Sequence, residues 1–128
     1  MRVVKILWID DAQAWTRSLQ ENLDLISKKY NVEFKFVNAE NGEDIIFQCN
    51  SYDFDIIVMD FDMEPFSGDK YINDVRNEEH LENIPILFYS QNNAIDLSSL
   101  LADGRNTECL YRPNLEDKIK EIFFKSNL

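Results

Sequence analysis

The 128-residue sequence predicts one α/β domain in which five parallel strands alternate with five helices. Two observations lead to this fold class. Short apolar runs rich in β-branched residues recur along the chain, which is typical of strands buried on both faces. Between these runs, apolar residues recur at spacings of three and four, which is typical of one face of a helix. Strands and helices that alternate in this way form right-handed crossovers and a parallel sheet covered on both sides.

The first half of the chain carries three strand signals and two helix signals. Residues 3–9 form a mainly apolar run that predicts the first strand, and a helix follows. The apolar face of that helix consists of Ala12, Trp15, Leu19, Leu23 and Ile26. Residues 32–37 alternate apolar and charged side chains, which predicts a second strand. The Asn41-Gly42 pair then breaks the chain before a short second helix. Residues 55–60 repeat the buried-strand pattern.

The second half continues the alternation. Gly68 precedes a third helix, and residues 84–90 form a fourth apolar run. A fourth helix is predicted from the apolar positions Leu97, Leu100 and Leu101. Gly104 can end that helix, because glycine tolerates the left-handed conformation found just after helix ends. Residues 107–111 predict a short fifth strand, and the last helix follows Pro113.

Composition excludes several classes of function. The formal net charge is −11, which argues against direct binding of nucleic acid, since that depends on clusters of lysine and arginine. Two cysteines and one histidine cannot form a disulfide framework or a Cys/His zinc site, so a reducing, cytoplasmic setting fits best. No apolar run approaches the roughly 20 residues of a membrane-spanning helix, so we expect no membrane association.

Polar side chains follow four of the five predicted strands. They are Asp10, Asp11, Asp60, Asp62, Ser90 and Arg112. Each has an ordinary structural explanation as a helix cap, a turn residue or a solvated cation. In a parallel sheet, however, the carboxyl ends of the strands meet at one edge, where ligands bind. Carboxylates gathered there repel one another and need a cation or a proton. A hydroxyl and a guanidinium add donors for a phosphoryl group, so the set predicts a phosphoryl-handling site that uses a divalent metal.

The motifs, taken in order, resemble the receiver domain of bacterial two-component response regulators over essentially the whole chain. KILWIDD is similar to the family's first strand and acidic pair, and AENGEDII to the start of its second helix. YDFDIIVMDFDMEPFSG is similar to the phosphoacceptor strand and loop, IPILFYSQ to the strand that ends in Thr or Ser, and CLYRPN to the Lys-Pro turn. The resemblance implies a single receiver domain over residues 1–128, with a doubly wound, flavodoxin-like sheet in the order 2-1-3-4-5.

The resemblance also implies a role for each residue at the strand ends. Asp60 would be the phosphoacceptor. Mg²⁺ would be bound by Asp10, Asp11 and Asp60, with Asp11 favoured over Asp10 as a direct ligand and the main-chain carbonyl of Asp62 as a further one.

Ser90 would hydrogen-bond the phosphoryl group, and Arg112 would neutralise its charge. The phosphoryl donor would be a histidine kinase or a phosphotransfer protein, and the signal would pass to an output protein or domain that the sequence does not identify. We expect no enzymatic activity beyond self-catalysed phosphorylation and dephosphorylation, and a monomer or weak dimer.

Three departures from the family pattern keep a second interpretation open. Arg112 replaces the family's lysine, Pro65 stands one position later than usual although Gly68 stays in register, and Cys109 occupies the position of the aromatic switch residue. A degenerate receiver that acts as a phosphorylation-independent interaction module would explain these departures. The retained acidic residues argue against it.

A third interpretation is a phosphatase. VMDFDME is superficially similar to the DxD motif of haloacid-dehalogenase-like phosphatases, in which the first aspartate is the nucleophile. That motif normally lies on the first strand, whereas here it lies on the third, with most of the required catalytic core missing downstream. A free-standing Mg²⁺-dependent phosphatase is therefore disfavoured.

Overall fold

The computed structural model describes residues 1–124 and confirms the predicted parallel sheet in the order β2-β1-β3-β4-β5. Its strands are β1 (Arg2–Ile9), β2 (Val32–Ala39), β3 (Ile56–Asp60), β4 (Ile86–Ser90) and β5 (Thr107–Tyr111). Strands β3 and β4 are buried at every position, which explains why their sequences are apolar runs without alternation. The order reverses between β1 and β3, so the polar residues that follow these strands lie beside the switch point of the sheet.

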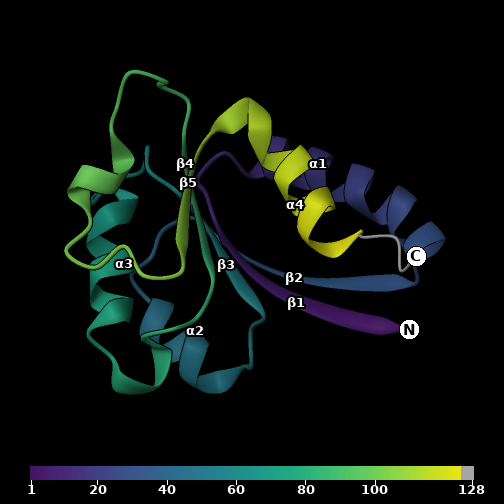
Figure 1. The fold of residues 1–128 in the computed structure, drawn as a ribbon, viewed down its shortest axis with the longest axis horizontal. Coiled ribbons are helices and arrows are strands. Elements are labelled where there is room, and N and C mark those ends of the chain that lie inside the picture. The colour runs from purple at the N-terminus through teal and green to yellow at the C-terminus, as the bar shows by residue number, and fades with distance from the viewer. Residues whose placement is uncertain (125–128) are drawn as a thin grey trace.

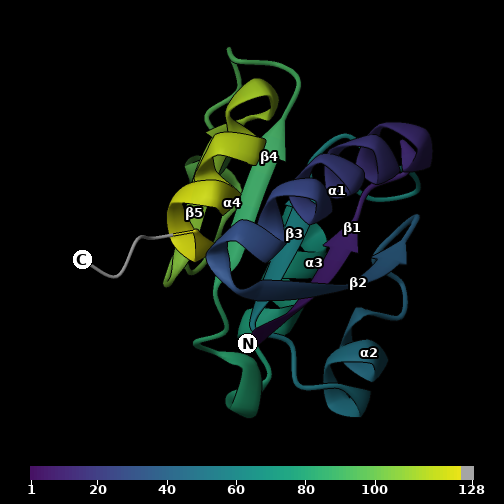
Figure 2. The same cartoon turned by 90° about the vertical axis from the view of Figure 1, so that its right-hand side faces the viewer.

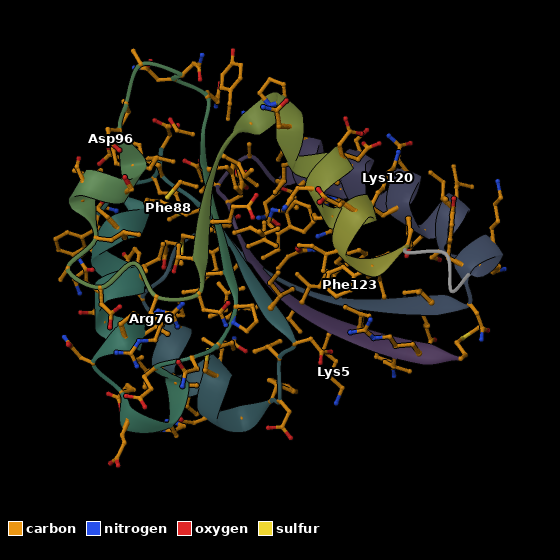
Figure 3. All side chains as sticks on the ribbon, viewed as in Figure 1. Lys5, Arg76, Phe88, Asp96, Lys120 and Phe123 are labelled. Carbon is orange, nitrogen blue, oxygen red and sulfur yellow. The ribbon has the colours of Figure 1, made fainter. Side chains whose placement is uncertain are left out.

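Helices cover both faces of the sheet, as the two cartoons show (Figures 1 and 2). The helices are α1 (Gln13–Ser27), α2 (Ile45–Ser51), α3 (Gly68–Arg76) and α4 (Leu115–Phe123). α1 and α4 pack on one face with side chains such as Trp8 and Leu115, and α2 and α3 pack on the other with side chains such as Leu7 and Ile72. In Figure 3, Phe88 lies on the α3 side of the sheet and Phe123 on the α4 side. This two-sided burial fixes the direction in which each strand presents its last residue.

The predicted fourth helix is wrong. Only a single 3₁₀ turn, Leu97–Leu100, forms between β4 and β5. The serines and Asp96 bond one another locally, with Ser98 Oγ donating to Asp96 Oδ1 at 2.7 Å, and such bonds compete with helix formation. Of the leucines that predicted the helix, only Leu97 is buried, so there is no continuous apolar face to hold a longer helix against the sheet.

The predicted end of that helix is wrong for the same reason. The 3₁₀ turn already ends at Leu100, the next residue, Leu101, is extended, and Gly104 has no positive φ angle. Two hydrogen bonds from α3 hold this segment instead: the side chain of Asn73 donates to the carbonyl of Leu100 and accepts from the N–H of Ala102. The link between β4 and β5 is therefore mostly irregular chain.

None of the helices within residues 1–124 combines the length and the apolar character that crossing a membrane requires.

Candidate functional site

Three carboxylates converge where β1 and β3 end. Asp10 and Asp11 follow β1, Asp60 is the last residue of β3, and one carboxylate oxygen from each lies within 4.8 Å of the others. Asp10 and Asp60 are almost fully buried, whereas Asp11 is exposed. The predicted clustering of acidic side chains is confirmed, and it places one accessible carboxylate beside two that are enclosed.

Asp10 is held by two donors. Its Oδ1 accepts a 2.7 Å hydrogen bond from the N–H of Ala12, and its Oδ2 accepts a 2.5 Å hydrogen bond from the hydroxyl of Tyr89. Tyr89 in turn accepts from Nε1 of Trp8 at 3.1 Å. Burial and the charge of Asp10 raise the pKa of the Tyr89 hydroxyl well above its usual value, so it remains protonated and remains a donor. Asp10 is therefore held in a fixed orientation by one backbone and one side-chain donor.

The carboxyl group of Asp60 has a raised pKa. Burial, followed by the negative charge of Asp10, raises the pKa of the Asp60 carboxyl from 3.8 to about 8. The 3.2 Å hydrogen bond from the N–H of Asp62 to Asp60 Oδ1 opposes that rise, as does the positive charge of Arg112. Asp60 therefore holds a proton more tightly than an ordinary carboxyl does, mainly because it is buried and also because Asp10 is negatively charged.

The side chain of Asp62 is bonded to the end of β4. Its Oδ2 accepts hydrogen bonds from Ser90 Oγ at 3.1 Å and from the N–H of Gln91 at 3.2 Å. Ser90 Oγ also accepts from the N–H of Asn92 at 3.0 Å. Ser90 therefore ends β4 beside the site, as predicted, and it is bonded to Asp62 and not to Asp60.

Arg112 comes directly after β5 and reaches the acidic cluster. Its Nη2 lies 3.9 Å from Asp10 Oδ2, within the distance of an ion pair. Its guanidinium stacks on the ring of Trp15, with Cζ 3.7 Å from the ring centroid. Among residues 1–124, the side chain of Arg112 donates no hydrogen bond, and its Nε is buried without a partner.

A cleft of about 370 Å³ opens beside the carboxylates. It is lined by Asp11, Phe61, Asp62, Met63, Glu64 and Ser67. Gly68 follows the lining residue Ser67, and a Cβ at Gly68 would collide with the carbonyl oxygen of Asp60 and press on the side chain of Met59. Glycine here lets α3 begin close against the end of β3, so the loop between them faces the cluster.

All the ligand atoms that the site offers are oxygens, and this set suits a hard divalent cation such as Mg²⁺. The exposed carboxylate of Asp11 leaves access for an ion and its waters. The residues present therefore fit a Mg²⁺ site.

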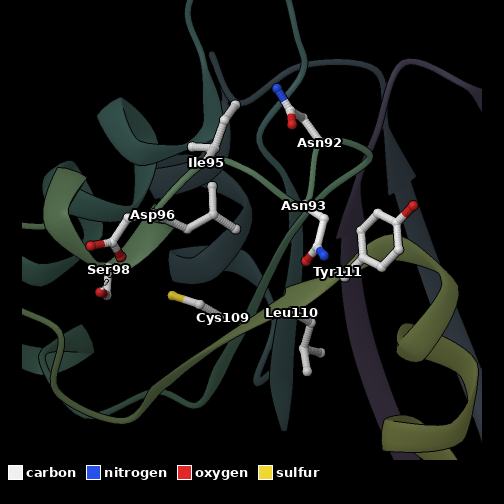
Figure 4. Close-up of a pocket in the computed structure, with 9 residues that line it drawn as sticks. Asn92, Asn93, Ile95, Asp96, Ser98, Cys109, Leu110 and Tyr111 are labelled. Carbon is white, nitrogen blue, oxygen red and sulfur yellow. Dashed lines mark hydrogen bonds between the residues drawn. The ribbon is translucent and has the colours of Figure 1, made fainter.

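The position that the family gives to its aromatic switch residue lies at a second pocket. The half-buried Cys109 projects from β5 toward the turn that carries Asp96 and Ser98 (Figure 4). This pocket, of about 190 Å³, lies where a fourth helix would cover β5. Burial raises the pKa of the Cys109 thiol, which keeps it uncharged at neutral pH.

Sequence reasoning missed three residues that shape the site: Trp8, Trp15 and Tyr89. All three are apolar enough to be assigned to the core, and they do pack there. The available signal was the period of two in a strand, which places Trp8 on the same face as Asp10. Nothing in the sequence indicates that Tyr89 reaches Asp10 from a strand that is not its neighbour.

A family model described as the response regulator receiver domain matches residues 6–123. No curated protein sequence is significantly similar to the chain. Among solved structures, the phosphorylated cyanobacterial phytochrome response regulator RcpA is similar at a TM-score of 0.77 with 18% identity, over 98% of this chain and 96% of that one.

Two further structures show the same likeness. The signal receiver domain of a DNA-binding response regulator from Colwellia psychrerythraea 34H has a TM-score of 0.73 and 22% identity, over 93% of this chain and 97% of that one. The receiver domain of the sensor histidine kinase PA1611 from Pseudomonas aeruginosa PAO1, with magnesium coordinated in its active-site cleft, has a TM-score of 0.74 and 17% identity, over 94% of this chain and 93% of that one. At these identities the likeness is one of fold.

Proposed function

The chain belongs to the response regulator receiver domain family, and from this membership we propose that it accepts a phosphoryl group on Asp60 and relays a signal by changing conformation. The observation that carries the proposal is the burial of Asp60 at the end of β3, within one cluster with Asp10 and Asp11. Receiver domains are signalling domains, and we confine the chemistry here to self-catalysed phosphorylation and dephosphorylation of the one carboxylate.

In the proposed reaction, a carboxylate oxygen of Asp60 attacks the phosphorus of the donor in line with the bond that breaks. The bond from phosphorus to the donor's leaving group is lost, and an acyl phosphate forms on Asp60. The leaving group departs with the electron pair of that bond and takes up a proton. Asp60 must be ionised to attack, so the proton that its raised pKa favours has to leave first.

The neighbouring residues prepare this attack. Mg²⁺, held by Asp11, Asp60 and the main-chain carbonyl of Asp62 with Asp10 beside them, would supply positive charge to the phosphoryl oxygens and favour ionised Asp60. Arg112 supplies a second positive charge, 3.9 Å from Asp10 Oδ2. Ser90 would exchange its bond to Asp62 for one to the phosphoryl group.

We propose a histidine kinase or a phosphotransfer protein as the phosphoryl donor, and a separate output protein or domain as the receiver of the signal. The net charge of −11 supports an output that does not bind nucleic acid through this domain. The two free cysteines support a reducing, cytoplasmic setting. We further propose that residues 1–128 act as one receiver domain, as a monomer or weak dimer.

The phosphatase interpretation is not favoured, because the second aspartate of its motif, Asp62, is engaged by Ser90 and the N–H of Gln91. A general acid for a leaving group would need to face the scissile bond instead.

Intact mass spectrometry after incubation with Mg²⁺ and acetyl phosphate tests the proposal. We expect one added phosphoryl group that is labile to base and to hydroxylamine, and no addition in Asp60→Asn. Asp53→Asn, which changes an exposed aspartate before β3, is the matched control and should be modified like the wild type. An unmodified wild type would favour the degenerate receiver. Modification that persists in Asp60→Asn, or that maps to Ser90, would overturn the assignment of Asp60 as the phosphoacceptor.

A further inference from the structure

Arg112 is held at the site by a ring and not by hydrogen bonds. Its side chain is only 15% exposed, and the nearest carboxylate oxygen, Asp10 Oδ2, lies 3.9 Å from Nη2, beyond hydrogen-bonding distance. The contact that is close is the one with Trp15, 3.7 Å from Cζ to the ring centroid. A guanidinium stacked by its face keeps the N–H donors at its edge free for other partners.

The ring of Trp15 is itself fixed in place. Trp15 lies in the first turns of α1, close in sequence to Asp10, so the helix that begins beside the site carries the ring. Its ring centroid is 6.0 Å from that of Tyr89, whose hydroxyl bonds Asp10. The ring and the carboxylate thus belong to one packed unit, and Arg112 lies against both.

We propose that Trp15 is a positioning residue for the phosphorylation reaction, whose ring holds the Arg112 guanidinium at the acidic cluster with its edge donors unpaired. The inference rests on the proposed function. Without the ring, the long side chain of Arg112 would sample other rotamers or close onto Asp10 in a hydrogen-bonded pair, and either would remove its donors from the phosphoryl group. A flat indole face suits a planar guanidinium, so the pair Trp15 and Arg112 replaces the flexible ammonium that a lysine would provide.

A double-mutant cycle tests this role. Phosphorylation rates at Asp60 with acetyl phosphate and Mg²⁺ are compared for wild type, Trp15→Leu, Arg112→Ala and the double variant. We expect Trp15→Leu to slow the reaction roughly fivefold to tenfold, as the loss of a partly desolvated cation–π contact predicts. In the Arg112→Ala background the same change should have almost no effect, because the group that the ring positions is absent. Equal effects in both backgrounds would show that Trp15 acts through the fold alone and would overturn the proposal.

Two further variants keep the cycle interpretable. Trp15→Phe preserves an aromatic face and should retain most of the wild-type rate even if Trp15→Leu folds poorly, and a rate as low as that of Trp15→Leu would contradict a role for the ring. Phe47→Leu removes an exposed aromatic side chain from α2 and is the matched control, expected to leave the rate unchanged.

A measurement that needs no phosphorylation separates this inference from the proposed function. In the side-chain NMR spectrum, the ring current of Trp15 should shift the Nε–Hε resonance of Arg112, and Trp15→Leu should abolish that shift while most backbone resonances stay in place. An Arg112 resonance that is the same in both proteins would overturn the positioning role. If the shift is lost as expected but the wild type takes up no phosphoryl group, the proposed function fails while the stacking contact stands.

Discussion

Asp60 combines a buried position with a negative neighbour, and this makes it a source of instability in the metal-free protein. Because its folded-state pKa is raised to about 8 from 3.8, the folded state binds the proton more tightly than the unfolded state does. The contribution of Asp60 to stability is therefore fully present below about pH 4 and is lost as the pH rises through about 8. We expect metal-free Asp60→Asn to melt several degrees above wild type at pH 8, with a smaller difference at pH 5. Thermal denaturation in the presence of a chelator measures both values, and a lower or unchanged melting temperature at pH 8 would contradict the clustering of charge.

Asp11 is the accessible carboxylate of the cluster, so its loss should act on metal binding more than on the fold. Changes to groups that merely orient a metal ligand typically weaken binding by roughly 10–100-fold, and Asp11→Asn removes the charge of a direct ligand. We therefore expect Mg²⁺ affinity to fall at least about tenfold, measured by titration of tryptophan fluorescence, since Trp8 and Trp15 both lie near the site. Asp44→Asn, another aspartate outside the cluster, is the control. Equal affinity in Asp11→Asn and wild type would remove the metal assignment.

Two substitutions at Arg112 test whether phosphorylation needs only a positive charge at this position or the shape of arginine as well. Arg112→Ala should lower the phosphorylation rate roughly tenfold or more, because losing one charge-assisted hydrogen bond costs about 1.5–3 kcal/mol. Arg112→Lys restores a cation with rotatable donors, so its rate should equal or exceed that of the wild type. Initial rates with acetyl phosphate measure both variants. A wild-type rate in Arg112→Ala would make Arg112 a surface cation and would strengthen the interpretation as a degenerate receiver.

At the scale of elements, one buried hydrogen-bonded chain joins strands that are not neighbours. Trp8 on β1 donates to Tyr89 on β4, and Tyr89 donates to Asp10, across the intervening β3. Tyr89→Phe keeps the ring packing but leaves the indole N–H without its acceptor and Asp10 without one donor. We expect a loss of about 1–3 kcal/mol in the free energy of unfolding, measured by urea denaturation. Tyr52→Phe, at an exposed tyrosine, should cost almost nothing, and a similar cost in both variants would show that the chain contributes nothing specific.

The same scale shows which elements the sequence predicts and which it does not. Buried strands such as β3 are predictable because a short apolar run bounded by turn residues is typical of a strand buried on both faces. Helix α1 is predictable because its apolar residues lie on one face over several turns. The segment after β4 is not predictable in this way, because its three leucines indicate a helix, whereas Asp96 and the serines bond locally and stop one. The carboxylates at the strand ends follow from topology alone. The contacts of Tyr89 and Trp15 do not, since both depend on side-chain packing between distant segments.

At the scale of the whole molecule, contacts connect the site to the segment between β4 and β5, where only a 3₁₀ turn forms. Ser90 bonds Asp62 at the site, and the chain then runs from Ser90 into the 3₁₀ turn Leu97–Leu100, which the side chain of Asn73 holds from α3. If phosphorylation of Asp60 draws Ser90 away from Asp62, two backbone hydrogen bonds lose their present geometry. They are the bond from the N–H of Gln91 to Asp62 and the bond from the N–H of Asn92 to Ser90 Oγ. The 3₁₀ turn has few local hydrogen bonds to break, so a change in conformation can extend along the segment at a small cost in free energy.

Hydrogen exchange tests that coupling. We expect phosphorylation to change amide exchange in residues 90–101 and in β5, around the pocket at Cys109, and to leave β2 at the far edge of the sheet unchanged. Ser90→Ala should still be phosphorylated on Asp60, because the nucleophile and the acidic cluster remain, but the response in residues 90–101 should shrink, since the hydroxyl that links the phosphoryl group to this segment is gone. A response of equal size in Ser90→Ala would show that the signal leaves the site by another route, with Arg112 and α4 as the remaining connection. A change spread evenly over the sheet would show that phosphorylation alters global stability and not one face.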